Sequence, residues 1–190
     1  LQQRMQRYGA VEFHKRLDRA NLSLRDTIHE GSLGELLYAL VQYSQRKSVP
    51  AEHFRKWVEG TNCFQYLGVH YVDLLAFVTD AVPVRAMAVG QRGWLSAQGI
   101  DTYDAIEALI EWELPSGRRF SSHLLTSWVD PECSSAMSDQ RLTVVGTGGR
   151  FESDQKRRGI QVVSDGQGLA EPNPDFCAAY GPEGRVEYRG

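Results

Sequence analysis

The stretch that decides the fold is AIEALIEWEL, which runs from Ala105 to Leu114. Apolar side chains occupy every second position in it, and glutamates lie on the opposite face. A period of two is typical of a β-strand that buries one face and leaves the other in water or at an interface. The turn signal Pro115–Arg118 comes next, and Arg119–Val129 then returns as an antiparallel partner. The stretch therefore indicates an antiparallel sheet.

Further strands are expected on both sides of this stretch. Val84–Val89 alternates before it, and a second hairpin follows it, with strands at Arg141–Val145 and Arg150–Ser153. Gly159–Ser164 is a further strand. The turn of the second hairpin, Gly146–Gly149, is rich in glycine, but it lacks the lysine of a phosphate-binding loop and precedes strand-forming residues. The sequence therefore predicts no nucleotide site there.

Most of the helices are expected in the part of the chain that precedes these strands, together with two shorter strands. The expected elements are, in order, a helix at Leu1–Tyr8, a short strand at Ala10–Phe13, a helix from the cap Ser23 to Gly31, a buried strand at Leu36–Tyr43, a loop that opens at Val49, and a helix around His70. Helices followed by consecutive hairpins favour an α+β fold. We expect an open, largely antiparallel β-sheet with helices packed on one face.

Length and composition fit one substantial globular domain. The chain has 190 residues, of which 42% are hydrophobic and 24% charged, and its formal net charge is -3. That charge gives no reason to expect a nucleic acid or a membrane as a partner. The 3 cysteines form no Cys-x-x-Cys pair and no zinc spacing with the 5 histidines. We therefore expect free thiols in a reducing cytoplasm, and no metal site.

A histidine and an aspartate interrupt an apolar run in the segment GVHYVD, Gly68–Asp73. At helical spacing His70 and Asp73 share one face, and the apolar residues around them supply burial. An imidazole beside a carboxylate can move a proton near neutral pH. The alternative is a satisfied core histidine, with Asp73 as an ordinary polar position. Taken alone, the hexapeptide favours that alternative, and the segments around it change the balance.

Four segments occur in an order that is specific when they are taken together. They are Gly31–Glu35, Gly68–Leu75, Asp101–Asp104 and Val145–Gly149. In this order they resemble the C-terminal domain of the glucose-fructose oxidoreductase / inositol dehydrogenase (Gfo/Idh/MocA) family, over residues 9–165. The resemblance implies an open sheet that shapes a substrate pocket and commonly forms the oligomer interface of an oxidoreductase.

The resemblance also implies how the chain is divided. Residues 1–8 would be the remnant of the last helix of a nucleotide-binding domain. Residues 9–190 would be a substrate-binding and oligomerisation domain that is cut short at its C-terminus. NAD or NADP would bind mainly to the nucleotide-binding domain, so no cofactor-binding residue is expected in this chain. The parent would be an NAD(P)-dependent dehydrogenase, and this chain alone is expected to be inactive.

By resemblance, His70 matches the family histidine that contacts the reacting hydroxyl or carbonyl of the substrate. Polyol-oxidising members have an aspartate four residues before it, where this chain has Tyr66. Oxidation of an alcohol by a nicotinamide needs a group that takes the hydroxyl proton. We expect His70 and Tyr66 to be the catalytic residues, with Tyr66 donating a hydrogen bond to a carbonyl or sugar hydroxyl. Asp73 then becomes a structural partner within the helix.

Four further residues are expected to bind the substrate: Arg16, Trp57, His53 and Lys56. Arg16 resembles a family arginine near the nicotinamide or substrate, and a surface arginine is the alternative. Trp57 lies with His53 and Lys56 in the loop that approaches the pocket in this family. A sugar would stack on Trp57, and a buried anchor is the competing explanation.

The expected function is therefore that of the substrate-binding and oligomerisation domain of an oxidoreductase that acts on a sugar, polyol or related carbonyl compound. The alternative is a non-catalytic relative that binds a ligand or scaffolds an oligomer. Tyr66 at the aspartate position favours the alternative, and retention of His70 opposes it. An exposed sheet face that bears Trp112 or Trp128 is expected to contact another copy, giving a homodimer or higher homo-oligomer.

Overall fold

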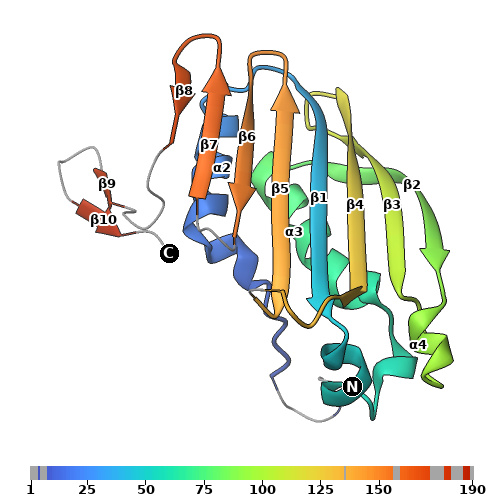
Figure 1. Cartoon of the computed structure of the whole chain (residues 1–190). Coiled ribbons are helices and arrows are strands. Elements are labelled where there is room, and N and C mark those ends of the chain that lie inside the picture. The colour runs from blue at the N-terminus through green and yellow to red at the C-terminus, as the bar shows by residue number, and fades with distance from the viewer. Residues whose placement is uncertain are drawn as a thin grey trace.

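The structure is a computed structural model, and it describes residue 4 and residues 8–134, 136–155, 159–171, 178–180 and 186–188. Its centre is an 8-stranded sheet in the order β2-β3-β4-β1-β5-β6-β7-β8 (Figure 1). The strands are β1 (Leu36–Arg46), β2 (Val82–Gln91), β3 (Ala105–Glu113), β4 (Arg119–Asp130), β5 (Ser138–Gly146), β6 (Gly149–Asp154), β7 (Gly159–Ser164) and β8 (Gly168–Ala170). A separate 2-stranded sheet joins β9 (Ala178–Tyr180) to β10 (Val186–Tyr188).

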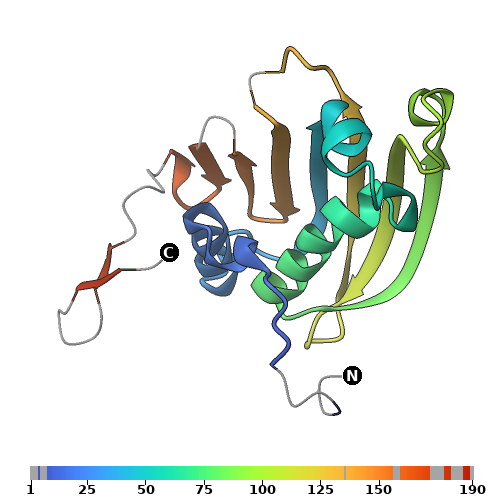
Figure 2. The same cartoon turned by 90° about the horizontal axis from the view of Figure 1, so that it is seen from below.

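Helices cover one face of the large sheet, and the other face is bare (Figure 2). The helical elements are η1 (His14–Leu17), α2 (Arg19–His29), η2 (Val49–His53), η3 (Val58–Gly60), η4 (Phe64–Gly68), α3 (Val69–Thr79) and α4 (Trp94–Ala97). Among the described residues, none of these helices has the length and apolarity needed to cross a bilayer. The elements labelled η are short helical turns, and α2 and α3 are the longer helices.

Strand pairing confirms the predicted α+β fold. All but one of the described pairings are antiparallel, and the exception is the parallel pair formed by β1 and β4. β1 comes first in the chain but lies in the middle of the sheet, between β4 and β5. The later hairpins therefore add to both sides of β1, which gives the open, largely antiparallel sheet that was expected.

The core lies between this sheet and the helices. Alternate residues of the strands face α2 and α3, and the large side chains buried there are Trp112, Trp128, Tyr71, Phe151, Leu24, Leu74, Leu75 and Leu124. Burying one such side chain stabilises the fold by about 1.5–3 kcal/mol. The strand pattern of Ala105–Glu113 thus sets which residues face the helices.

Trp112 and Trp128 are not on the exposed face, so the prediction that they contact another copy is wrong. Both have an exposed fraction of 0%. The indole of Trp112 donates to Oγ of Ser122 at 2.8 Å, and that of Trp128 donates to Oε1 of Gln45 at 3.2 Å. Each indole N–H therefore has a partner inside the core, which lets both rings point towards the helices.

Several elements before β2 differ from the predictions. Residues 10–13 are not a strand, and α2 begins at Arg19 because Asp18, not Ser23, caps it by accepting from the N–H of Ala20 at 2.9 Å. β1 is longer than predicted and exposes one of its faces. The expected loop after Val49 contains η2 and η3, and α4 was not predicted at all.

Only part of each end of the chain is described. Most of the helix predicted at Leu1–Tyr8 lies outside the described residues. The described part of the tail after Glu171 consists of β9 and β10.

The glycine-rich turn between β5 and β6 is a hairpin, as predicted. It packs against the Gly34 segment: the N–H of Gly148 donates to the carbonyl of Leu33, and the N–H of Glu35 donates to the hydroxyl of Thr147, both at 2.9 Å. Gly34 has a φ of 66°, and a Cβ there would lie 2.5 Å from the Thr147 hydroxyl. The glycines thus serve a close backbone contact.

Candidate functional site

His70 lies in the first turn of α3, where it faces the segment of η1. The ring of His14 lies 5.0 Å from that of His70 between centroids, and Phe13 meets the same ring edge-on at 6.2 Å. The side chain of His70 is half-buried. Its Nδ1 is buried and has no hydrogen-bond partner among the described residues. A buried polar atom without a partner is unusual and marks a position where a ligand or a function is expected.

The surroundings of His70 disfavour its charged form. Burial is the largest cause that lowers the pKa of His70 from 6.5, followed by the basic neighbours His14 and Lys15. The carboxylates of Asp73 and Glu12 act in the opposite direction. A neutral imidazole carries a lone pair that can accept a proton. The site therefore favours the form that a general base needs near neutral pH.

Asp73 is bound by Arg16 and not by His70 in the described structure. Nε of Arg16 donates to Oδ2 of Asp73 at 2.7 Å, and Nη2 donates to Oδ1. This two-point contact is the geometry that a guanidinium and a carboxylate prefer. The hydrogen bond to Asp73 raises the pKa of Arg16. The contact supports the expectation that Asp73 is a structural partner, and it holds η1 against α3.

Tyr66 lies in an aromatic cluster that was not predicted. Its ring is 4.8 Å from that of Phe54, 5.7 Å from that of Trp57 and 6.0 Å from that of Trp128, between centroids. Trp57 also packs on Phe54 at 4.4 Å and keeps 46% of its surface exposed. We name Phe54, Trp57, Tyr66 and Trp128 the aromatic cluster. Trp57 is thus a partly exposed ring, and not the buried anchor of the competing explanation.

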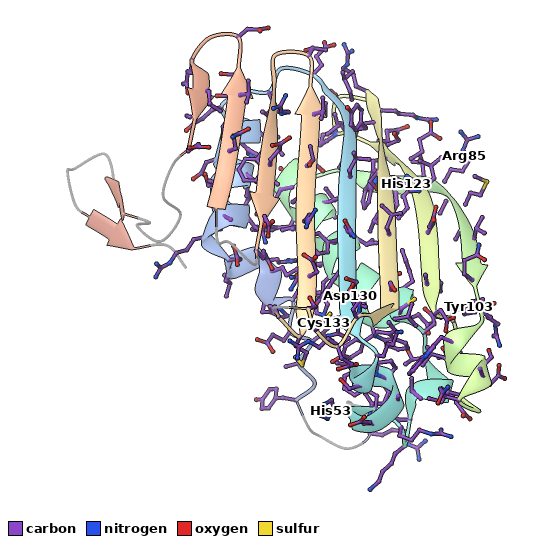
Figure 3. The ribbon with its side chains drawn as sticks, in the orientation of Figure 1. His53, Arg85, Tyr103, His123, Asp130 and Cys133 are labelled. Atoms are coloured by element: carbon purple, nitrogen blue, oxygen red, sulfur yellow. The ribbon has the colours of Figure 1, made fainter. Side chains whose placement is uncertain are left out.

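The remaining predicted residues lie at one end of the sheet. His53 ends η2, Lys56 follows it, and both side chains are exposed. In the view of Figure 3, His53 lies below the end of β4 that carries Asp130. No contact joins either side chain to His70 within the described residues. The structure thus brings Arg16 close to the turn of His70 and leaves His53 and Lys56 at the surface near Trp57.

Lys15 follows His14 in η1, and the sequence did not single it out. It is buried, and its Nζ lies 5.0 Å from the ring centroid of Tyr43 and 4.9 Å from that of Tyr71. In the sequence Lys15 stands between His14 and Arg16, in a basic run that is typical of a solvated surface. No local signal distinguishes it, because its burial depends on β1 and β5, which are distant in sequence.

The arrangement can accept a proton at His70 and offer an aromatic surface to a ligand. It has no obvious place for a metal: the described residues contain no group of three or more His, Cys, Asp or Glu side chains that could hold one. Cys63 is buried and Cys133 is exposed, and neither is in a disulfide. Proton transfer at an imidazole is therefore the chemistry that these residues support.

We compared the chain with known protein families and with curated protein sequences. The family described as the GFO/IDH/MocA C-terminal domain matches residues 21–152. The chain belongs to this family. The match contains η4, α3 and the strands from β1 to β5, and so it includes both His70 and the aromatic cluster. No curated protein sequence matches the chain.

Solved structures share the fold of this Gfo/Idh/MocA domain. An inositol dehydrogenase homologue from Azotobacter vinelandii, in complex with NADH and myo-inositol, is 18% identical with a TM-score of 0.71, and the match covers 90% of this chain and 44% of that one. Oxidoreductases from Sinorhizobium meliloti (17% identity, TM-score 0.68, 91% and 43% covered) and Pseudomonas syringae (18%, 0.67, 90% and 43%) are similar. The chain thus spans less than half the length of these three proteins.

Proposed function

We propose that this chain is the substrate-binding domain of an NAD(P)-dependent oxidoreductase that acts on a sugar, polyol or related carbonyl compound. The observation that carries the proposal is His70, a half-buried imidazole with an unpartnered Nδ1 and a lowered pKa, in a domain of this family. Oxidation of a secondary alcohol sends a hydride to the nicotinamide and a proton to a base. His70 takes that proton, and it returns the proton when a carbonyl is reduced.

NAD or NADP would be supplied by a nucleotide-binding domain outside this chain. In this proposal residues 1–8 belong to that domain, and residues 9–190 form the substrate-binding and oligomerisation domain. The proposal is supported by the greater length of the solved relatives, one of which is in complex with NADH and myo-inositol. Free Cys63 and Cys133 agree with a cytoplasmic location, which we also propose.

The aromatic cluster supplies the wall of the proposed site. The exposed part of Trp57 is a flat apolar surface on which the carbon face of a sugar ring can stack. Tyr66 adds a hydroxyl that can donate to a carbonyl or hydroxyl oxygen of the substrate. His53 and Lys56 supply polar groups near Trp57, and Arg16 supplies one on the side of His70, where it pairs with Asp73.

A second candidate function is a non-catalytic relative that binds a ligand or scaffolds an oligomer. One observation favours it: Tyr66 packs into the aromatic cluster where polyol-oxidising relatives are expected to have an aspartate. Without that carboxylate, an imidazolium at His70 has less electrostatic help. Hydride transfer therefore has to be measured directly.

The test uses the longer protein that contains this chain together with its nucleotide-binding domain. NADH or NADPH formation is followed by the absorbance of the reduced nicotinamide, with sugars and polyols as substrates. We expect turnover that depends on the dinucleotide, and none from the 190-residue chain alone. Turnover by the isolated chain would contradict the proposal, and ligand binding without turnover by the longer protein would favour the scaffold.

We also propose that the bare face of the sheet contacts a second copy of this chain. Met87, Leu109 and Leu40 are exposed by 65%, 44% and 44%. They lie in one row across β2, β3 and β1, and His123 of β4 completes the row between Leu109 and Leu40 (Figure 3). A row of exposed side chains on a sheet face that is apolar at three of its four positions is typical of an interface.

Sedimentation velocity tests this interface. The wild-type chain should sediment as a dimer or larger species at micromolar concentration, and Leu109→Glu should shift it to the monomer. Met137→Glu is the matched control, because Met137 is 56% exposed but lies in the connection between β4 and β5. A wild-type chain that is monomeric throughout would contradict the proposal.

A further inference from the structure

His14 of η1 contacts His70, and the proposed function gives it no role. The two imidazole rings lie 5.0 Å apart between centroids, with 55° between their planes. His14 is exposed, whereas His70 is half-buried and has a buried Nδ1 without a hydrogen-bond partner among the described residues. The pair therefore joins an imidazole that reaches water to one that is partly withdrawn from it.

The two residues that follow His14 hold η1 in this place. Nζ of the buried Lys15 lies 4.9 Å from the ring centroid of Tyr71. Arg16 donates to both carboxylate oxygens of Asp73. Both partners belong to α3, so η1 is held against the helix that carries His70. A side chain supported in this way by packing and hydrogen bonds around it keeps a defined position.

Two imidazoles at this distance repel each other if both are protonated. A like charge within about 4–6 Å disfavours the charged form of its neighbour. After burial, His14 is the group that does most to lower the pKa of His70. We propose that His14 is a positioning residue for His70: its ring packs against the imidazole of His70 and, when protonated, opposes a second positive charge there, which keeps His70 ready to accept a proton. The catalytic meaning of this inference rests on the proposed function, whereas the contact and the charge relation do not.

Other titratable or charged groups lie on the elements packed against His70. Lys15, Asp73 and Glu12 also act on its protonation. Within the described residues, His14 is the titratable side chain whose ring lies against that of His70. The full set is Glu12, Lys15, Arg16 and Asp18 beside or within η1, Arg19, Arg25, Asp26 and His29 on α2, Tyr66 in η4, and Tyr71, Asp73 and Asp80 on α3 or at its end.

The test is a pH titration of the histidine ring signals of the 190-residue chain by NMR, with His14→Gln and His70→Gln variants to assign the two signals. In the wild type, His70 should titrate below 6.5, and the ring protons of the two residues should show a nuclear Overhauser effect. His14→Phe keeps an aromatic ring against His70 but removes the charge, so the His70 midpoint should shift upward. His14→Gln is a second neutral variant and should also raise it. His14→Lys restores a positive charge and should keep the midpoint below that of His14→Phe.

His29→Phe is the matched control. His29 is also an exposed histidine, but it pairs with Asp80 at 3.6 Å, and no ring contact joins it to His70 within the part of the chain that the structure describes. It should leave the His70 midpoint unchanged. An unshifted midpoint in folded His14→Phe or His14→Gln would overturn the inference, and so would the absence of the nuclear Overhauser effect in the wild type.

None of these results depends on turnover, so the proposed function can fail separately. In the longer protein, the acid limb of kcat/KM should move with the His70 midpoint when His14 is replaced by Phe. A limb that stays in place while the NMR midpoint moves would contradict the proposed function and support the charge relation between the two histidines.

Discussion

Two consecutive turns of one helical segment carry the proposed site, and their surroundings differ in kind. Tyr66, in η4, packs among aromatic rings. His70, in the first turn of α3, faces the rings of His14 and Phe13 and keeps a buried Nδ1. The turn of Tyr66 can select ligands by their shape, and the turn of His70 can control whether its imidazole is protonated. The difference teaches that the position where the resemblance leads us to expect an aspartate is part of an aromatic cluster in this chain.

The largest expected effect is at His70. In the longer protein, His70→Ala should lower kcat by about 10²–10⁴-fold, because the group that takes the proton is lost. His29→Ala is the control, since His29 is exposed and pairs with Asp80 away from this turn. Circular dichroism and thermal unfolding should show that both variants remain folded. Wild-type-like turnover by His70→Ala would remove the proposed role.

The next effect concerns the buried charge of Lys15. The pKa of Lys15 is lowered from 10.5 to about 8 in the folded state. Between these two pH values the folded protein therefore binds fewer protons at Lys15 than the unfolded protein does. Stability therefore rises with pH through that window, and below pH 8 the charge costs on the order of 3 kcal/mol. Lys15→Met removes this cost, so urea unfolding at pH 7 should show a gain over the wild type that shrinks towards pH 10. A difference that stays constant with pH would contradict this explanation.

A smaller effect is expected in the aromatic turn. Tyr66→Phe keeps the ring and removes the hydroxyl, which is worth about 0.5–1.5 kcal/mol as one hydrogen bond. The longer protein should then show a KM that rises by up to about tenfold, with kcat retained. If Tyr66→Phe instead lost kcat as completely as His70→Ala, the two turns would share one catalytic role and the comparison between them would fail.

The smallest effect is expected at Asp73. Asp73→Asn keeps the shape of the side chain and removes a negative charge that raises the pKa of His70. The His70 midpoint should therefore move down. Since the Arg16 side chain is 44% exposed, loss of the ion pair should lower the midpoint of urea unfolding only slightly. An upward shift of the midpoint would mean that another group controls His70.

The strands were predictable because their signals are local. The alternation of Ala105–Leu114 and the glycine turn at Gly146–Gly149 each specify a strand or hairpin within a few residues. The parallel pairing of β1 with β4 was not predictable from such patterns, because it joins segments that are distant in the chain. The faces of Trp112 and Trp128 were misjudged for dimerisation, although the alternation itself already placed Trp112 with the apolar residues.

The site was predictable only in part, for the same physical reason. The segment Gly68–Asp73 has a recognisable pattern, and the pairing of Asp73 with Arg16 agrees with a structural role for the carboxylate. The burial of Lys15 could not be predicted from the sequence, because Tyr43, Tyr71 and Gln140, which surround it, come from three separate elements. The aromatic cluster likewise needs Trp128 of β4 beside Tyr66 of η4. Contacts between distant segments decide which polar residue is buried.

The most direct test of the central claim, that His70 is the base of the site, is the pH dependence of kcat/KM in the longer protein. Activity should fall on the acid side with a midpoint below 6.5, because burial, His14 and Lys15 lower the pKa of His70. The residual activity of His70→Ala should lack this acid limb. A midpoint at or above 6.5, or the same limb in His70→Ala, would contradict the account.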